Sequence, residues 1–193
     1  MRQDVFESMS RKLSEVLHHK GLLDEADVPF LQYRTEGILE ELFFWFVILG
    51  IAKPFKIRKQ VAIYTAATLL YRKNMGGWHA KTAKECQVLS IVTVISVVIL
   101  ADRCNLSKLI GTKGNLICVV TAIIGLFVPL NKAEELQLDE KDIAICVRHK
   151  TVTIIFMTAL EVLAYKTDNA FAATYMLLGL LTTLVSIGVS YIS

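Results

Sequence analysis

The chain has 193 residues, and 54% of them are hydrophobic. Its mean hydropathy of +0.50 excludes an ordinary soluble domain, which could not bury so much apolar surface at this size. The formal net charge of +3 is too small to indicate a nucleic-acid-binding protein, and the sequence has no basic stripe with interleaved aromatic residues. Apolar residues occur instead in long runs between short charged clusters, which is typical of a helical membrane protein with several spans.

The first segment predicts an amphipathic helix over residues 1–20, with apolar residues at helical spacing and basic residues elsewhere around the helix. Such a helix either lies in the membrane interface or packs against the rest of the protein. Gly21 favours the end of this helix, and Asp24 to Pro29 predicts a loop. Charges continue through residues 1–36, so no cleavable signal peptide is expected.

Two short apolar runs follow, Gly37–Ala52 and Val61–Tyr71. A helix over the first would cover about 24 Å, less than a bilayer core of about 30 Å. The pair either crosses the membrane or forms a re-entrant hairpin that turns at Lys53-Pro54. Four longer runs predict firm transmembrane helices: Val88–Ala101, Leu116–Leu130, Val152–Tyr165 and Ala170–Ile192.

The predicted fold class is therefore all-α, a polytopic helical membrane protein. It has four firm transmembrane helices plus a short helical pair, six in all if the pair crosses. We expect a single membrane domain over 1–193, in which 1–36 form a cytoplasmic or interfacial segment and 37–193 form the transmembrane bundle. Lys and Arg gather on the side that holds the N-terminus and residues 72–87, however the short pair is resolved. This bias predicts that both lie in the cytoplasm.

Residues 71–87 carry the pattern that predicts chemistry. His79 and Cys86 lie seven residues apart in this polar connection. Cysteine catalysis needs a thiolate, a base that takes and returns a proton, and access for a peptide. An ordinary polar loop with an incidental thiol is the alternative interpretation of the same spacing. The other cysteines, Cys104, Cys118 and Cys146, lie in or beside apolar runs and have no metal-ligand spacing, so no metal or other cofactor is expected.

On one continuous helix, His79 and Cys86 would be separated by about 10.5 Å along the axis, too far for contact. The pair Gly76-Gly77 favours irregular backbone instead, and the segment 82–85 has the form of a capping box that begins a helix. His79 could then fold back from the loop. Cys86 would lie in the first turns of the helix, where the positive end of the helix dipole favours a thiolate.

The arrangement of Arg72, Gly76-Gly77, His79 and Cys86 resembles the accessory gene regulator B (AgrB) family. Its members are small polytopic membrane endopeptidases of Gram-positive bacteria that process quorum-sensing peptide precursors. The resemblance extends over essentially the whole chain in length and hydropathy layout. It implies that Cys86 is the nucleophile and His79 its base.

The same resemblance implies that Arg72 and Gly77 occupy positions important for activity, with Gly76 beside them. The run Pro129–Lys132 resembles the family's connection after a middle span, with a longer basic cluster reduced here to Lys132. We therefore expect Lys132 to support substrate binding.

The resemblance implies a cysteine endopeptidase that removes the C-terminal part of a peptide pheromone precursor through a thioester acyl-enzyme. A Cys or Ser of the precursor would then displace Cys86 and close a thiolactone or lactone ring. The implied partners are an AgrD-like precursor with an amphipathic N-terminal helix, membrane lipid and a second copy of the chain in a homodimer; nucleic acid is not among them. The implied location is the cell membrane.

Two alternatives remain open from the sequence. The first is a small transporter or exporter of peptides without proteolytic activity, and the second is a non-catalytic membrane scaffold. Glu161 bears on the first, because an acid inside the fifth apolar run is costly enough to suggest function. Its position near Tyr165 would also allow it to reach the membrane interface.

Overall fold

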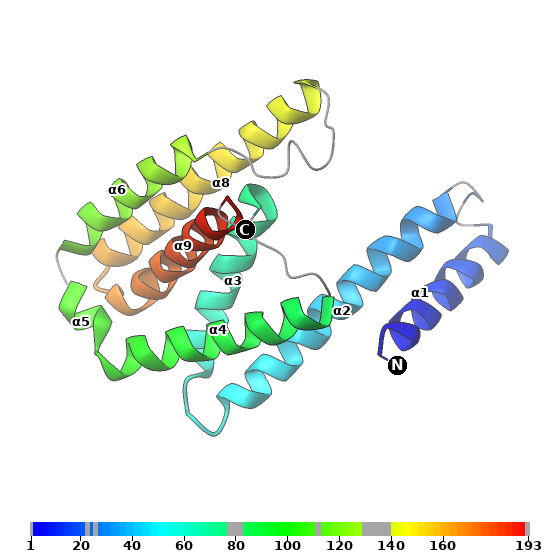
Figure 1. The fold of residues 1–193 in the computed structure, drawn as a ribbon, viewed down its shortest axis with the longest axis horizontal. Helices are drawn as coiled ribbons and strands as arrows, with labels where there is room; N and C mark the ends of the chain where they lie inside the picture. The colour runs from blue at the N-terminus through cyan, green and yellow to red at the C-terminus, as the bar shows by residue number, and fades with distance from the viewer. Residues whose placement is uncertain are drawn as a thin grey trace. The chain divides into compact units, whose positions relative to one another are not determined.

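The computed structural model describes residues 2–21, 24, 27–76, 83–110, 113–128 and 140–191. Within these ranges the chain is helical and contains no strand, which confirms the all-α class. The helices are α1 (Arg2–His19), α2 (Val28–Ala52), α3 (Arg58–Met75), α4 (Ala83–Arg103), α5 (Leu106–Ile110), α6 (Gly114–Phe127), α8 (Glu140–Lys166) and α9 (Ala170–Ser190) (Figure 1). They belong to two compact units, Met1–Ile51 and Ala52–Ser193, and each unit is described by itself.

The first unit consists of α1 and most of α2. Gly21 has a φ of 69°, in the left-handed region that favours glycine, and its N–H donates to the carbonyl oxygen of His18 at 2.9 Å. The predicted end of α1 is therefore confirmed. The predicted loop is shorter than expected, because Pro29 lies in the first turn of α2, where its missing N–H leaves no hydrogen bond unmade. The rings of Phe6 and Phe43 join α1 to α2, with their centroids 5.7 Å apart.

Three helical segments of the described chain are long and apolar enough to cross a membrane: Glu85–Arg103, Ile143–Lys166 and Ala170–Ser190. The prediction of four firm spans and a short pair therefore differs from the structure in its count. The predicted span 116–130 corresponds to α6, whose 14 residues cover about 21 Å. Val128, with a ψ of 126°, is already extended, as expected for a residue that precedes a proline.

The C-terminal end of α6 is held by a buried cation. Lys150 of α8 is 4% exposed, and its Nζ donates to the carbonyl oxygens of Leu126 at 3.0 Å and Val128 at 2.6 Å. The last carbonyls of a helix have no partner within the helix, and the helix dipole is negative there. The Lys150 ammonium from the neighbouring helix α8 therefore donates hydrogen bonds to these carbonyl oxygens and also compensates the negative end of the helix dipole.

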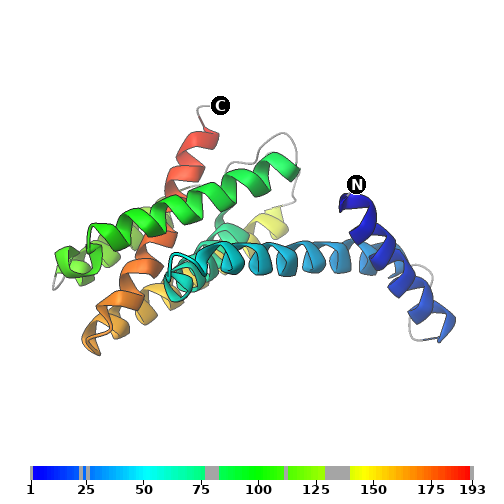
Figure 2. The same ribbon diagram turned by 90° about the horizontal axis from the view of Figure 1, so that it is seen from below.

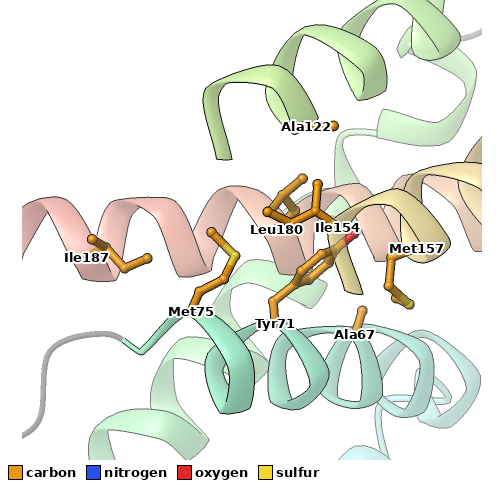
Figure 3. Packing of buried hydrophobic residues seen from close by; sticks show 8 residues of the cluster. All are labelled: Ala67, Tyr71, Met75, Ala122, Ile154, Met157, Leu180 and Ile187. Carbon is orange, nitrogen blue, oxygen red and sulfur yellow. The ribbon is translucent and has the colours of Figure 1, made fainter. Parts of the chain in front are cut away.

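In the second unit, α3 packs along α9, while α6 and α8 lie against α9 on another side (Figure 1). Their shared core is apolar (Figure 3) and contains Ala67, Tyr71, Met75, Ala122, Ile154, Met157, Leu180 and Ile187. A glycine permits the close approach of α3 and α9. A Cβ added at Gly179 would lie 2.9 Å from the Cβ of Ala67 and 3.0 Å from the backbone nitrogen of Thr68.

Helix α4 packs on α3, and the short α5 at its end contacts α9 (Figures 1 and 2). Most of the apolar surface of α4 points outward, and Val88, Val92 and Leu100 are each more than half exposed. An outward-facing apolar surface of this kind is compatible with a lipid environment, because lipid tails are themselves apolar. One face of α4 is nevertheless turned toward α3, and this face carries Cys86.

Candidate active site

The site begins where α3 ends. Arg72 lies in the last turn of α3, and Gly76 directly follows the helix with a φ of 84°, a conformation that favours glycine. The N–H of Gly76 donates to the carbonyl oxygen of Arg72 at 2.9 Å. The predicted backbone break at the glycine pair is therefore confirmed at Gly76.

Cys86 lies at the start of the next helix. Helix α4 begins at Ala83, as the capping-box pattern predicts, and Cys86 is its fourth residue and half-buried. This position is within the first turns, where the positive end of the helix dipole acts on a side chain. Three of the predicted site residues, Gly77, His79 and Lys132, lie outside the described residues. The predicted approach of His79 to Cys86 therefore stays a prediction.

Cys86 and Arg72 line the same pocket, which has a volume of about 190 Å³. Three helices form its walls. Helix α3 contributes Tyr64, Thr68 and Arg72; α4 contributes Cys86, Leu89, Ser90, Thr93 and Val94; and α9 contributes Thr182 and Ser186. On each helix these residues recur every three or four positions, the spacing at which side chains share one helix face. One face from each of the three helices therefore lines the pocket.

Arg72 and Cys86 are the lining residues of α3 and α4 that lie closest along the chain to the connection between these helices. Arg72 is in the last turn of α3, and Cys86 is the fourth residue of α4. Tyr64 and Val94 lie eight residues further along their helices, which corresponds to about 12 Å. Arg72 supplies the only guanidinium and Cys86 the only thiol among the described lining residues.

Hydrogen bonds hold the pocket walls in place. The hydroxyl of Tyr64 donates to Oγ1 of Thr182 at 2.8 Å. The Thr182 hydroxyl in turn donates to the carbonyl oxygen of Leu178, also at 2.8 Å. Oγ1 of Thr68 donates to the carbonyl oxygen of Tyr64, also at 2.8 Å. These bonds fix the rotamers of three lining side chains and engage their O–H protons. The walls therefore offer rigid hydroxyl oxygens as acceptors.

A second polar group lies in the core beside this site. Glu161 of α8 has no exposed surface, and its Oε1 accepts a hydrogen bond of 3.0 Å from the hydroxyl of Tyr71. The thiol of Cys118 on α6 lies against the same carboxyl. Oε2 of Glu161 has no hydrogen-bond partner among the described residues. Glu161 thus turns into the bundle and joins α8 to α3, instead of reaching the interface.

Sequence reasoning missed the hydroxyl residues of the pocket and the partner of Glu161. A signal for the first was present, because polar residues stand four apart within apolar runs: Tyr64, Thr68 and Arg72 on α3, and Thr182 and Ser186 on α9. Such a row marks a helix face that avoids lipid. No local pattern pairs Tyr71 with Glu161, because 90 residues separate them along the chain.

Comparison with known proteins gives a family. The family model of accessory gene regulator B matches residues 10–189, a range that contains Arg72, Cys86 and every residue of the pocket. No curated protein and no solved structure gives a significant match. Because the family match covers almost the whole chain, the protein belongs to the accessory gene regulator B family and has a role in the accessory gene regulator quorum-sensing system.

Proposed function

We propose that this protein is a membrane-embedded cysteine endopeptidase that cleaves an AgrD-like peptide precursor, the partner that family membership implies. The observation that carries the proposal is that Cys86 and Arg72 line one pocket. A nucleophile and a cation beside a cavity are what acyl transfer from a peptide bond requires. His79, in the adjoining connection, supplies the base.

The reaction follows from these groups. His79 takes the proton of the Cys86 thiol, and the thiolate attacks the carbonyl carbon of the scissile peptide bond. The guanidinium of Arg72 offsets the negative charge that develops on the carbonyl oxygen. The carbon–nitrogen bond then breaks, and the leaving amine takes the proton from His79. The N-terminal part of the precursor remains attached to Cys86 as a thioester, and the C-terminal part is released.

Ring closure uses the energy kept in this thioester. A Cys or Ser side chain of the precursor gives its proton to His79 and attacks the thioester carbon. The bond between this carbon and Sγ of Cys86 then breaks, and the Cys86 thiolate takes the proton back from His79. The product is a thiolactone or a lactone, and no water is consumed in this step. Attack by water would give a linear peptide instead, so a half-buried Cys86 in an apolar helix bundle favours cyclisation.

The membrane setting is part of the proposal. Met9, Leu13 and Val16 of α1 are 51%, 46% and 49% exposed and lie on one helix face, which supports an interfacial position beside the amphipathic helix of the precursor. The basic connections support a cytoplasmic position for residues 72–87. We place the protein in the cell membrane of a Gram-positive bacterium as a homodimer, as the family resemblance implies.

The test is co-expression with a precursor that carries a C-terminal tag. Cys86→Ala and His79→Ala are each expected to abolish release of the tag while the protein remains in the membrane fraction. Cys104→Ala, at an exposed cysteine that does not line the pocket, is the matched control and should cleave normally. Undiminished cleavage by Cys86→Ala overturns the proposal. Export of intact precursor by that variant would favour a transporter.

A further inference from the structure

The buried pair of Tyr71 and Glu161 lies directly beside a residue that we propose for the cleavage reaction. We infer that Glu161 is a positioning residue for this reaction: through the Tyr71 hydroxyl it sets the last turn of α3, and with it the guanidinium of Arg72, relative to the pocket. The inference rests on the proposed function, because it assumes that Arg72 offsets charge on the carbonyl oxygen. It adds α8 to the active centre, a helix that contributes no described residue to the pocket walls.

Glu161 belongs to a pair of helices that are packed in a fixed register. Its carboxyl lies against the Cys118 thiol of α6. A Cβ added at Gly114 of α6 would overlap the ring of Tyr165 on α8. These two contacts are four residues apart on each helix, in opposite directions, so the same faces of two antiparallel helices meet. Lys150 of α8 also holds the C-terminal end of α6. The Glu161 carboxyl is therefore a rigid anchor point.

Tyr71 connects this anchor to α3. Its ring reaches from α3 into the apolar core (Figure 3), and its hydroxyl donates to Oε1 of Glu161 at 3.0 Å. Thr68 and Asn74, on the neighbouring turns, donate instead to carbonyl oxygens of α3 itself. Apolar contacts are non-directional and tolerate small rotations, whereas a hydrogen bond weakens steeply when its angle changes. The bond to Glu161 therefore fixes the rotation of α3 at this level.

Arg72 follows Tyr71 on the helix, about 1.5 Å along the axis and about 100° around it. Tyr71 can therefore face the core while Arg72 lines the pocket. Only helical backbone lies between the two side chains, so a rotation of the last turn moves Arg72 with it. Electrostatic stabilisation of a developing negative charge needs a donor in the right place, and a misplacement of about 1 Å can cost about 100-fold in rate. The rate of cleavage should therefore depend on the Tyr71–Glu161 bond.

Loss of the bond should lower the rate of cleavage more than the binding of the precursor. Tyr71→Phe removes the donor and keeps the ring. We expect kcat of precursor cleavage by the full-length protein to fall about tenfold or more, while KM changes less than about twofold. Glu161→Gln keeps an oxygen that accepts from Tyr71 and should stay within about threefold of the wild-type kcat. Glu161→Leu has no such oxygen and should behave like Tyr71→Phe.

A double-mutant cycle tests whether Tyr71 acts through Arg72. Arg72→Met removes the guanidinium and keeps the apolar stem, and its residual cleavage is measured under single-turnover conditions. Tyr71→Phe should lower the wild-type rate about tenfold but the Arg72→Met rate by less than about twofold. Val98→Ala is the stability control, because it removes methyl groups from a buried side chain of α4 that does not line the pocket. It should lower the thermal unfolding midpoint and leave kcat unchanged.

Equal losses of rate from Tyr71→Phe in the two backgrounds would overturn the inference, because the pair would then act by a route other than Arg72. A wild-type kcat in Tyr71→Phe or in Arg72→Met would overturn it as well. The Tyr71→Phe series decides this even if Glu161→Leu does not fold. Failure of the peptidase proposal is seen separately, as precursor cleavage that persists in Cys86→Ala.

Discussion

The hydroxyl of Tyr71 donates a 3.0 Å hydrogen bond to Oε1 of Glu161, on a carboxyl with no exposed surface. Tyr71 directly precedes Arg72, so this bond fastens α3 to α8 next to a residue that lines the pocket. An acidic group is costly inside a membrane-spanning helix and is normally paired there. Glu161 therefore has a positional role: it fixes the end of α3 from the core.

Loss of this bond should loosen the bundle. Tyr71→Phe removes the donor and leaves the buried carboxyl with one partner fewer, a change that costs about 1–3 kcal/mol. The thermal unfolding midpoint in detergent should fall by several degrees. Tyr33→Phe removes the same hydroxyl from a side chain that is 75% exposed and should leave the midpoint unchanged. Equal midpoints for the two variants would contradict the assigned role.

The contact of α3 with α9 should tolerate no added methyl group. Gly179→Ala places a Cβ 2.9 Å from the Cβ of Ala67 and 3.2 Å from Oγ1 of Thr68, so the helices must separate. Overpacking of this kind costs about 1–3 kcal/mol. Gly188→Ala on the same helix meets nothing within 4 Å and should be neutral or slightly stabilising. Detergent melting curves of the two variants give the comparison.

The buried Lys150 should be more important to stability than an exposed lysine of the same helix. Lys150→Met keeps the apolar stem but removes the ammonium from the carbonyl oxygens of Leu126 and Val128, which costs about 1–3 kcal/mol. Lys166→Met makes the same change at the exposed end of α8. We expect faster proteolysis after α6 only in Lys150→Met, measured by limited digestion and mass spectrometry. Identical digestion patterns would show that the capping bonds contribute little.

Arg72 should act on the rate of cleavage more than on precursor binding. A lysine keeps the charge but cannot present two parallel N–H donors, so Arg72→Lys should lower kcat of precursor cleavage while KM changes less. Loss of one such donor typically reduces kcat by about 100-fold to 1000-fold. Arg103→Lys, at the exposed end of α4, is the control. A rise in KM at constant kcat would instead make Arg72 a binding residue.

Local signals predicted much of the fold. Run length identified the three helices that are long and apolar enough to span a membrane. The capping-box pattern predicted the start of α4, and the glycines predicted the ends of α1 and α3. The predicted length of α6 was wrong because the apolar run continues past Val128, whereas the backbone there is already extended before the proline. The early start of α2 was missed because Asp24 to Pro29 looks like a loop, although a proline is compatible with a first helical turn.

The site was predictable only in part. Cys86 and Arg72 flank one short connection, and the family resemblance named both. The third wall of the pocket comes from Thr182 and Ser186, about a hundred residues further along the chain. Contacts over such a separation depend on how the helices pack, for which a single sequence has no local signal. The same is true of Tyr71 and Glu161.

The contribution of α9 to the pocket has a consequence for biosynthesis. A nascent chain that has been translated only as far as α8 already contains the thiol, the guanidinium and two of the walls, but it lacks Thr182, the acceptor that fixes Tyr64. The cavity is therefore completed only when the last helix has docked. Synthesis itself thus delays completion of the pocket until the last helix has been made.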